Sequence, residues 1–243
     1  PNIPLVYHFG GLSSVVPTEL LDAIDFYPGN YSARYGRGVG GIVDVALRNP
    51  KQDRYRGFVE NSVLGLRLLA EGPIAEGWSF FASGQRSWLD LLLPPLLEPS
   101  GVNTALPRWA DYQVALAHEK SSGSSFRLLF FGADDDFDIL NRIPASTDPT
   151  LGGAFGYHTS FWRVQGRFVS RLAEDTQLRL TAAYGHDSID VSLGTNAGQT
   201  TLRPLSGRAE LSQRLAASTV ANLGVDLVYE PYDLALQLPP PTR

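Results

Sequence analysis

The stretch Gln177-Leu178-Arg179-Leu180-Thr181-Ala182-Ala183-Tyr184-Gly185-His186-Asp187 alternates between apolar and polar side chains. In an extended strand this period of two sends successive side chains to opposite faces. One face therefore carries Leu178, Leu180, Ala182 and Tyr184, and the other carries Gln177, Arg179, Thr181 and Asp187. Such a strand suits a sheet that lipid wets on one side and a polar interior on the other.

The same alternation continues from about residue 55 and predicts about nine antiparallel strands. We expect them at residues 56–63, 66–74, 78–90, 109–120, 125–138, 157–172, 177–192, 201–215 and 219–235. Several exceed the ~9–11 residues that a strand needs to cross a bilayer, whereas strands of soluble proteins average about 5–6 residues. The pattern favours membrane-spanning strands over a soluble β-sandwich with one wetted face.

The connections between these strands fall into two classes. Short polar turns are expected at 75–77, 121–124, 173–176 and 216–218, and longer segments rich in Pro, Gly and Asn at 94–107, 141–156 and 194–200. Short turns at one end of the sheet and long loops at the other are typical of outer-membrane barrels.

The overall composition excludes several other classes of protein. A formal net charge of −5 argues against a nucleic-acid surface. The chain has no cysteine, so disulfides and thiolate metal sites are absent. No stretch approaches the ~18–20 uncharged apolar residues of a membrane-spanning helix.

Residues 1–50 have a different character, because Pro and Gly interrupt every periodic run. Short strands are expected at Ala23–Tyr27 and Gly41–Leu47, and a short helix at Pro17–Leu21, with Pro17 near its first position and Glu19 in its first turn. This pattern predicts a small, loop-rich α/β piece that ends near residue 50.

A run of features within this piece resembles a known family. These features in chain order are the strand Ile24–Tyr27, the turn Pro28-Gly29, the aromatic-Gly dipeptide Tyr35-Gly36, the pair Gly40-Gly41 and the β-branched strand Ile42–Val45. This order resembles the C-terminal part of the plug domain of TonB-dependent receptors. The spacer Lys51–Arg54 and the later Gly72-Pro73-Ile74 also fit that family, whereas Pro28-Gly29-Asn30-Tyr31 replaces its commoner Arg-Gly-Pro order.

The same glycines allow one other interpretation, a phosphate-binding loop. The spacing of Gly36, Gly38, Gly40 and Gly41 matches neither G-x-G-x-x-G nor the Walker pattern, and no Gly-Lys-Ser/Thr follows. We interpret Gly29, Gly36, Gly40 and Gly41 as turn residues of the plug.

The resemblance implies a larger protein than this chain. Barrels of ~8 strands are filled by their own side chains, whereas barrels that enclose a plug have ~22 strands. We therefore expect a mainly β fold: residues 1–50 as the C-terminal part of a small α/β plug domain, and residues 51–243 as about nine of about 22 strands of a transmembrane β-barrel, forming an open sheet. Because the chain lacks Met and its last residues, Leu238-Pro239-Pro240-Pro241-Thr242-Arg243, resemble an interrupted loop, we expect both ends to be cut.

The resemblance also implies active uptake of a scarce ligand across the bacterial outer membrane, driven by TonB with ExbB/ExbD through a segment outside this chain. An iron chelate such as a ferric siderophore is the expected ligand; vitamin B12, an oligosaccharide or a peptide are alternatives. We expect contact with outer-membrane lipid, no nucleic-acid partner and no cofactor. The rivals are a passive porin or adhesin-like barrel, and a barrel enzyme, although neither G-x-S-x-G nor a Ser/His/Asp signature is present.

Two sets of charged residues are candidates for function. By resemblance, Arg34 and Arg37 would contact acidic residues of the barrel wall, with Glu210, Asp226 and Glu230 as candidates; the alternative is a solvated surface arginine. Arg163, Arg167 and Arg171, with Arg179, would form an electropositive wall that attracts anionic ligands. We favour the alternative for this second set, an ordinary polar lining paired with acids.

Four aspartates near the end of one predicted strand are candidate metal ligands. Asp134, Asp135, Asp136 and Asp138 offer oxygen ligands of the kind Ca²⁺ takes. Alternation sends Asp135 to the face opposite Asp134 and Asp136, which favours a solvated acidic rim. None of the four histidines has a partner at a metal-binding spacing.

Overall fold

A computed structural model describes residues 1–243 except 10, 37–39, 93–103, 141–154 and 239–243, and it does not describe the side chains of 104–106 and 139–140. The described chain is mainly β, with a large antiparallel sheet. No helix within the described ranges is long and apolar enough to cross a membrane.

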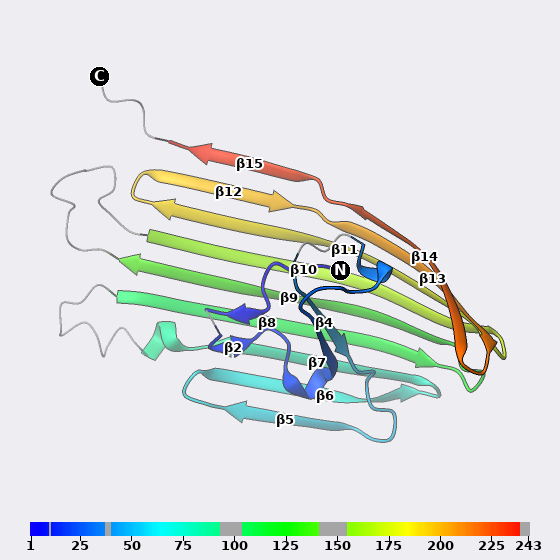
Figure 1. The fold of residues 1–243 in the computed structure, drawn as a ribbon. Coiled ribbons are helices and arrows are strands. Elements are labelled where there is room, and N and C mark those ends of the chain that lie inside the picture. Colours follow the sequence, from blue (N-terminus) through cyan, green and yellow to red (C-terminus); the bar gives the residue numbers. More distant parts are fainter. Residues whose placement is uncertain (10, 37–39, 93–103, 141–154, 239–243) are drawn as a thin grey trace.

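Eleven strands form the large sheet (Figure 1). They are β5 (Arg56–Asn61), β6 (Gly65–Ala75), β7 (Trp78–Ser87), β8 (Thr104–Glu119), β9 (Ser125–Leu140), β10 (Phe155–Ala173), β11 (Thr176–Leu193), β12 (Asn196–Leu202), β13 (Leu205–Ala216), β14 (Thr219–Tyr229) and β15 (Tyr232–Gln237). Each strand from β5 to β11 pairs with the next in antiparallel fashion. No pairing among the described residues joins β5 to β14, so the sheet is open.

Two of the nine predicted strands are interrupted by proline. The partner of β11 is β13 up to the pair Tyr184–Leu205 and β12 from the pair Asp187–Leu202 onward. Between them lies Pro204, which has no N–H to donate to the ladder. Pro231 breaks β14 from β15 in the same way. The nine predicted strands are therefore present in order in one antiparallel sheet, with the predicted 201–215 and 219–235 each broken once.

The predicted connections are confirmed at the four short turns, and one predicted long loop is wrong. Residues 194–200 form a tight hairpin, in which Gly194-Thr195 joins β11 to β12. Gly194 takes a left-handed backbone (φ 59°), which glycine adopts without steric cost. Most of the other two predicted loops, 94–107 and 141–156, lies outside the described residues.

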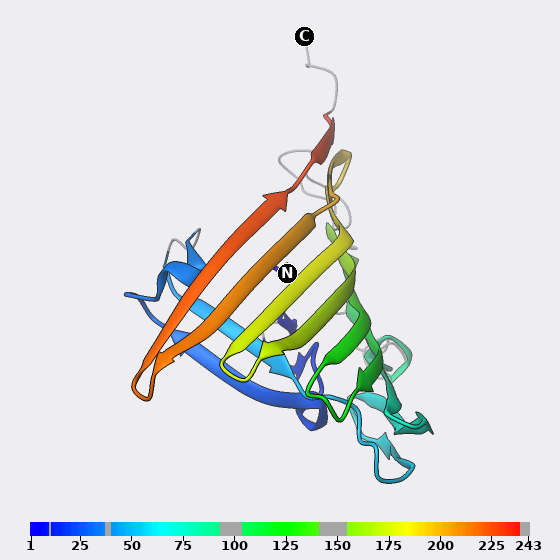
Figure 2. The ribbon, with the colours of Figure 1, turned by 90° about the vertical axis from the view of Figure 1, so that its right-hand side faces the viewer.

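The N-terminal segment, residues 1–50, lies across one face of the sheet (Figures 1 and 2). It contains β1 (Tyr7–His8), β2 (Ser13–Ser14), the 3₁₀ helix η1 (Thr18–Leu20), β3 (Leu21–Tyr27), the 3₁₀ helix η2 (Ala33–Tyr35) and β4 (Ile42–Leu47). The strands β3 and β4 pair, as predicted. The expected helix is a single 3₁₀ turn because Leu21 is already extended (φ −72°, ψ 138°) and begins β3.

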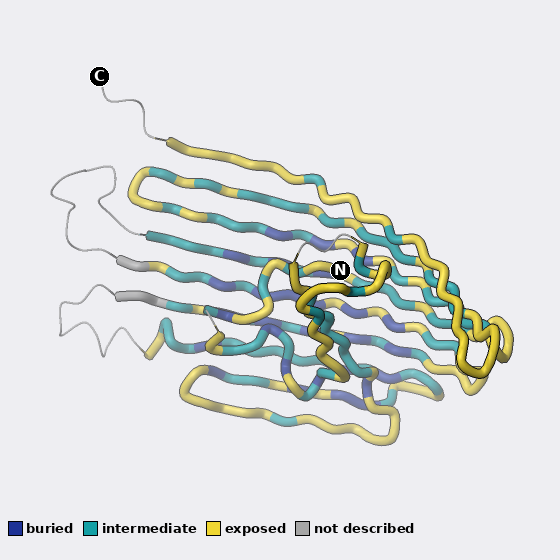
Figure 3. Tube along the Cα trace, in the orientation of Figure 1, coloured by how far each residue is buried: buried dark blue, intermediate teal, exposed yellow. Residues whose placement is uncertain are grey.

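We call the face beneath the N-terminal segment the covered face and the opposite one the outer face. Alternation along the strands assigns each side chain to one of them. The covered face carries a buried core to which the N-terminal segment contributes Val15 and Leu20, both 0% exposed. Its sheet members are Leu69, Phe81, Ala115, Leu129, Phe131, Ala133 and Phe161. Figure 3 shows these buried positions concentrated on the strands beneath the segment.

The outer face is apolar and exposed. Val114, Leu128, Phe130, Val164, Phe168 and Leu180 are each 37–46% exposed. An aromatic row crosses four strands here: Tyr112, Phe130, Trp162 and Tyr184, with neighbouring ring centroids 5.3, 6.3 and 5.7 Å apart. Further along the same face, away from the short turns, the side chains become polar, with Asp134, His158 and His186.

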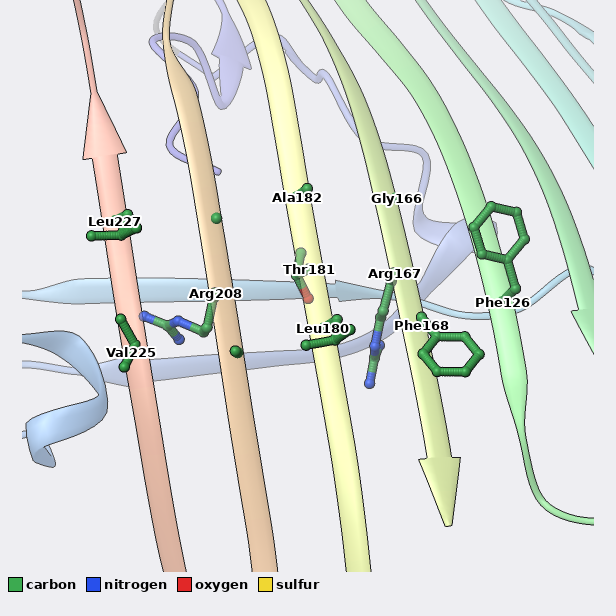
Figure 4. Close-up of a pocket in the computed structure, with 12 residues that line it drawn as sticks. Phe126, Gly166, Arg167, Phe168, Leu180, Thr181, Ala182, Arg208, Val225 and Leu227 are labelled. Atoms are coloured by element: carbon green, nitrogen blue, oxygen red, sulfur yellow. The ribbon is translucent and has the colours of Figure 1, made fainter. Parts of the chain in front are cut away.

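A shallow depression of about 410 Å³ lies on the outer face (Figure 4). Its floor is a row of small residues in direct register across three strands, Gly166, Ala182 and Gly207. Larger apolar side chains, including Phe126, Phe168 and Leu227, frame it.

Two outer-face glycines on neighbouring strands differ in the space that a substituted side chain would find. A Cβ at Gly132 would overlap the Phe161 carbonyl oxygen and the Tyr112 side chain, whereas a Cβ at Gly166 has nothing within 4 Å. We expect Gly132→Ala to lower the free energy of unfolding by about 1–3 kcal/mol through overpacking, and Gly166→Ala to change it by less than about 0.5 kcal/mol. Equilibrium urea unfolding measures both, and equal effects would contradict the pairing register of β8 to β10.

Candidate functional site

The candidate functional site is the interface between the N-terminal segment and the covered face. Most buried polar side chains of the described chain lie on this face. Buried charged groups are rare in proteins unless they are paired. Many polar contacts fasten the segment to the sheet, and four groups of them centre on His8, Arg48, Arg163 and Arg34.

The first contact surrounds His8 of β1, which is completely buried. Its Nε2 lies 3.1 Å from Oδ2 of Asp111 on β8, and its Nδ1 hydrogen-bonds Oδ1 of Asp135 on β9. The ring stacks on Trp109 with centroids 5.8 Å apart. Gln113 donates from Nε2 both to Asp111 Oδ1 (2.9 Å) and to the Val15 carbonyl oxygen (2.7 Å). The carboxylates of Asp111 and Asp135, on two neighbouring strands, thus contact the two ring nitrogens of one imidazole.

This arrangement favours the charged imidazolium. Burial is the largest single influence and lowers the pKa of His8, but the hydrogen bonds and charges of Asp111 and Asp135 together raise that pKa above its usual 6.5. Each ring nitrogen contacts a different carboxylate, so both can donate only in the protonated form.

The second contact lies where the N-terminal segment ends. Arg48 donates from Nη1 and Nη2 to the two carboxylate oxygens of Glu71, at 2.6 and 3.0 Å. Glu71 is 4% exposed and also accepts the backbone N–H of Lys51 at 3.1 Å. The Arg48 Nε donates back to the Glu19 carbonyl oxygen at 2.7 Å. This bidentate pair holds the junction between residues 1–50 and β5 against β6.

The third contact involves Arg163, which is 2% exposed. Its Nη1 and Nη2 lie 2.5 and 3.0 Å from the carboxylate oxygens of Asp187, and its Nε and Nη2 donate to the Asn2 carbonyl oxygen at 3.2 and 3.0 Å. Gly185 stands opposite Arg163 in the ladder, and a Cβ there would overlap the Arg163 side chain. The glycine therefore opens the diagonal path from Arg163 to Asp187.

The fourth contact joins η2 to β13. Arg34 Nε lies 3.1 Å from Glu210 Oε1, and the Arg34 carbonyl oxygen accepts from Arg208 Nη2 at 2.8 Å. Arg208 also pairs with Asp226 at 2.6 Å, and Arg179 Nη1 reaches Glu210 Oε2 at 3.3 Å. The structure thus brings Arg34, Glu210 and Asp226 into one group. Glu230 is exposed beside the break at Pro231, and Arg37 lies outside the described residues.

The arginines predicted to form a wall differ in their surroundings. Arg163 and Arg179 pair with acids, which agrees with the polar-lining interpretation. Arg167 is half-buried on the covered face, and Arg171 is exposed near the short-turn end. The four arginines therefore do not act as one uniform surface.

The aspartates 134, 135, 136 and 138 divide as alternation predicts. Asp136 pairs with Arg108 at 2.6 Å and Asp134 lies 3.6 Å from His158, both on the outer face. Asp135 points to the covered face and contacts His8. Within the described ranges, no group of three His, Asp or Glu side chains is placed to hold a metal ion.

The predicted turn glycines are also unequal. Gly40 has φ +107°, which requires glycine, whereas a Cβ at Gly41 would lie 3.5 Å from the Phe26 ring, an ordinary van der Waals contact. Gly36 is right-handed (φ −61°), so its backbone conformation does not require glycine. In the Pro28-Gly29-Asn30 turn the left-handed residue is Asn30 (φ 54°), not Gly29.

Sequence analysis missed His8, Asp111, Gln113, Glu71 and Arg48 as site residues. The available signal was the placement of acids on the same strand face as apolar residues, as with Glu71 beside Leu69 and Asp135 beside Ala133. Comparison of the chain with protein-family models, with curated proteins and with solved structures finds no match.

The raised pKa of His8 predicts pH-dependent docking of the N-terminal segment. Stabilisation by the imidazolium is complete below about pH 6.5 and is lost as pH rises through the higher folded-state pKa. We therefore expect the protection factors of residues 1–16, which compare the observed hydrogen-exchange rate with the intrinsic rate at each pH, to fall from acidic to mildly alkaline pH. The charged groups that face His8 are Asp111 and Asp135, which lie on two different strands of the sheet.

The variant His8→Asn removes the titrating group, so the protection factors of residues 1–16 should be lower at low pH and should stay flat across the range. His158→Asn, on the outer face, is the matched control and should leave the pH profile of residues 1–16 unchanged. An unchanged profile in His8→Asn would show that another group controls docking.

Proposed function

We propose that this chain is part of a TonB-dependent receptor of the bacterial outer membrane. Residues 1–50 are then the C-terminal part of the plug domain, and residues 51–243 the N-terminal part of the transmembrane barrel wall. The observation that carries the proposal is the contrast between the two faces of the sheet. One face is apolar and exposed, and the other holds a folded segment by buried polar contacts.

The dimensions of the outer face support a lipid environment. On the outer face of β10, apolar side chains extend from Trp162 to Leu172 with Ser170 as the one polar side chain between them. These ten residue-to-residue steps span roughly 33 Å along a strand. At a tilt of about 40° this corresponds to the ~25 Å apolar band of outer-membrane barrels. The aromatic row of Tyr112, Phe130, Trp162 and Tyr184 would then lie at one border of that band. In water, an apolar face of this extent would promote aggregation.

The chemistry of the covered face supports a segment that moves. Replacing buried ion pairs with apolar groups is often neutral or stabilising, so stability alone does not require Arg48–Glu71 or Arg163–Asp187. A polar interface has a different advantage, because both surfaces can be hydrated after separation. This is what a plug needs if it must leave the wall and return.

In this proposal the plug blocks passive flow through the barrel. A ligand binds on the outer side, and energy delivered by TonB with ExbB/ExbD displaces the plug. The family resemblance supplies this energy source, and an iron chelate of the siderophore class is the proposed ligand. The contact of Arg34 with Glu210 and Arg208 is one of those that must open.

A charge on the outer face tests the membrane assignment. Val225 on β14 is 61% exposed on the outer face, while Asn222 on the same strand points to the covered face. We expect Val225→Arg to destabilise the bilayer-inserted protein by about 2–4 kcal/mol and Asn222→Arg to have little effect. Unfolding from lipid vesicles measures this difference, and equal tolerance of both changes would argue for a soluble protein.

Uptake by whole cells tests the transport assignment. Cells that produce the full-length protein should accumulate a labelled ferric siderophore, and TonB-deficient cells should not, because the plug then stays closed. A panel of siderophores, vitamin B12 and oligosaccharides identifies the ligand. TonB-independent passage of small solutes would instead favour a porin, and hydrolysis of a substrate would favour an enzyme.

A further inference from the structure

A group of four arginines lies between the N-terminal segment and the sheet. Arg127 on β9 and Arg167 on β10 stand directly opposite each other in the ladder. Like charges in that position repel each other and destabilise a sheet. Arg179 on β11 and Arg34 on η2 complete the group, and both pair with the same carboxylate, Glu210.

The group has too few acidic partners. Arg127 is 8% exposed and donates from Nη1 to the Leu47 carbonyl oxygen at 2.7 Å, yet its Nε has no hydrogen-bond partner. The Nε of Arg179 is likewise buried without a partner. Among the described residues, Arg167 forms neither a hydrogen bond nor an ion pair. Buried donors of this kind are normally satisfied.

The surrounding charges leave a positive excess. Glu210 and Asp22 of β3 are the carboxylates that act on Arg127 and Arg167. The neighbouring Arg208 is already paired with Asp226; Figure 4 shows Arg167 and Arg208 on either side of β11. Four arginines thus face two carboxylates.

Solvent reaches the group from one side. The side chains of Arg34 and Arg179 are 46% and 28% exposed, while Arg127 lies at the bottom. The outer part of the group, where Arg34 and Arg179 lie, is therefore in contact with solvent.

We propose that Arg127 and Arg167, with Arg34 and Arg179 at the entrance, form a binding site for the carboxylate or phosphate group of a small soluble anion. The guanidinium fork matches the spacing of two oxygens on one carboxylate or phosphate. A bound anion would remove the repulsion between the two opposed arginines and occupy their free donors. The site depends only on the covered face, so it stands whether or not the sheet crosses a membrane.

Inorganic phosphate and citrate are suitable probes, added to the purified full chain at constant ionic strength set with sodium chloride. We expect one or both to bind by isothermal titration calorimetry and to raise the Tm. Arg167→Gln should weaken that binding tenfold or more. Without added anion, the same variant should have a higher Tm than the unmodified protein, because the repulsion with Arg127 is gone.

Arg171→Gln is the matched control, since Arg171 lies on the same face of β10, four residues away, and is exposed. It should leave both anion binding and Tm unchanged. Unaltered binding in Arg167→Gln, or a lower Tm of that variant without anion, would overturn the proposal, because Arg167 would then have a structural role. Stabilisation by phosphate and citrate no greater than by chloride would mean charge screening and would also overturn it.

Discussion

The register of the antiparallel ladder is the constraint on which the rest of the structure depends. Because side chains alternate between faces, a slip of one residue would move every apolar group of a strand to the opposite face. It would also move Asp111 away from Asp135, so that the two carboxylates could no longer both contact His8. The outer face, the buried core and the contacts to the N-terminal segment are therefore consequences of one register.

Glycine and proline adjust this ladder at a few positions. Gly185 leaves room for the Arg163 side chain to reach Asp187 across the strands. Gly132 makes room for the ring of Tyr112 on the outer face. Pro204 and Pro231 interrupt neighbouring strands at the same level, and the Arg203 N–H donates to the Pro231 carbonyl oxygen at 3.0 Å across the two breaks. The interruptions thus preserve the order of the strands.

The N-terminal segment contributes little regular structure of its own, and its position comes from contacts with the sheet. Val15 and Leu20 enter an apolar core, but the surrounding groups are charged or polar. A cost of such an interface is that each buried charge must find its partner. Most do so in pairs, such as Arg48 with Glu71, and the opposed Arg127 and Arg167 are the exception.

Local pattern was sufficient for the strands, the short turns and the two faces, because alternation is a property of neighbouring residues. It was insufficient at residues 194–200, where glycine-rich composition suggested a loop and pairing with β15 stabilises a strand instead. The alternation also assigned Asp135 to the sheet face opposite that of Asp134 and Asp136, but it did not indicate which residue Asp135 would contact. The partner is His8, 127 residues away.

The amino-acid sequence by itself determined that this chain forms long amphipathic strands after a glycine-rich segment, since periodicity and backbone freedom are local. Only the tertiary structure decided which charges meet. Three sets of contacts depend on the pairing register of several strands taken together. They are His8 with Asp111 and Asp135, Arg34 with Glu210, and Arg127 opposite Arg167. No spacing within one strand contains that information, because contacts between distant segments are set by how the whole sheet pairs and by what packs on its covered face.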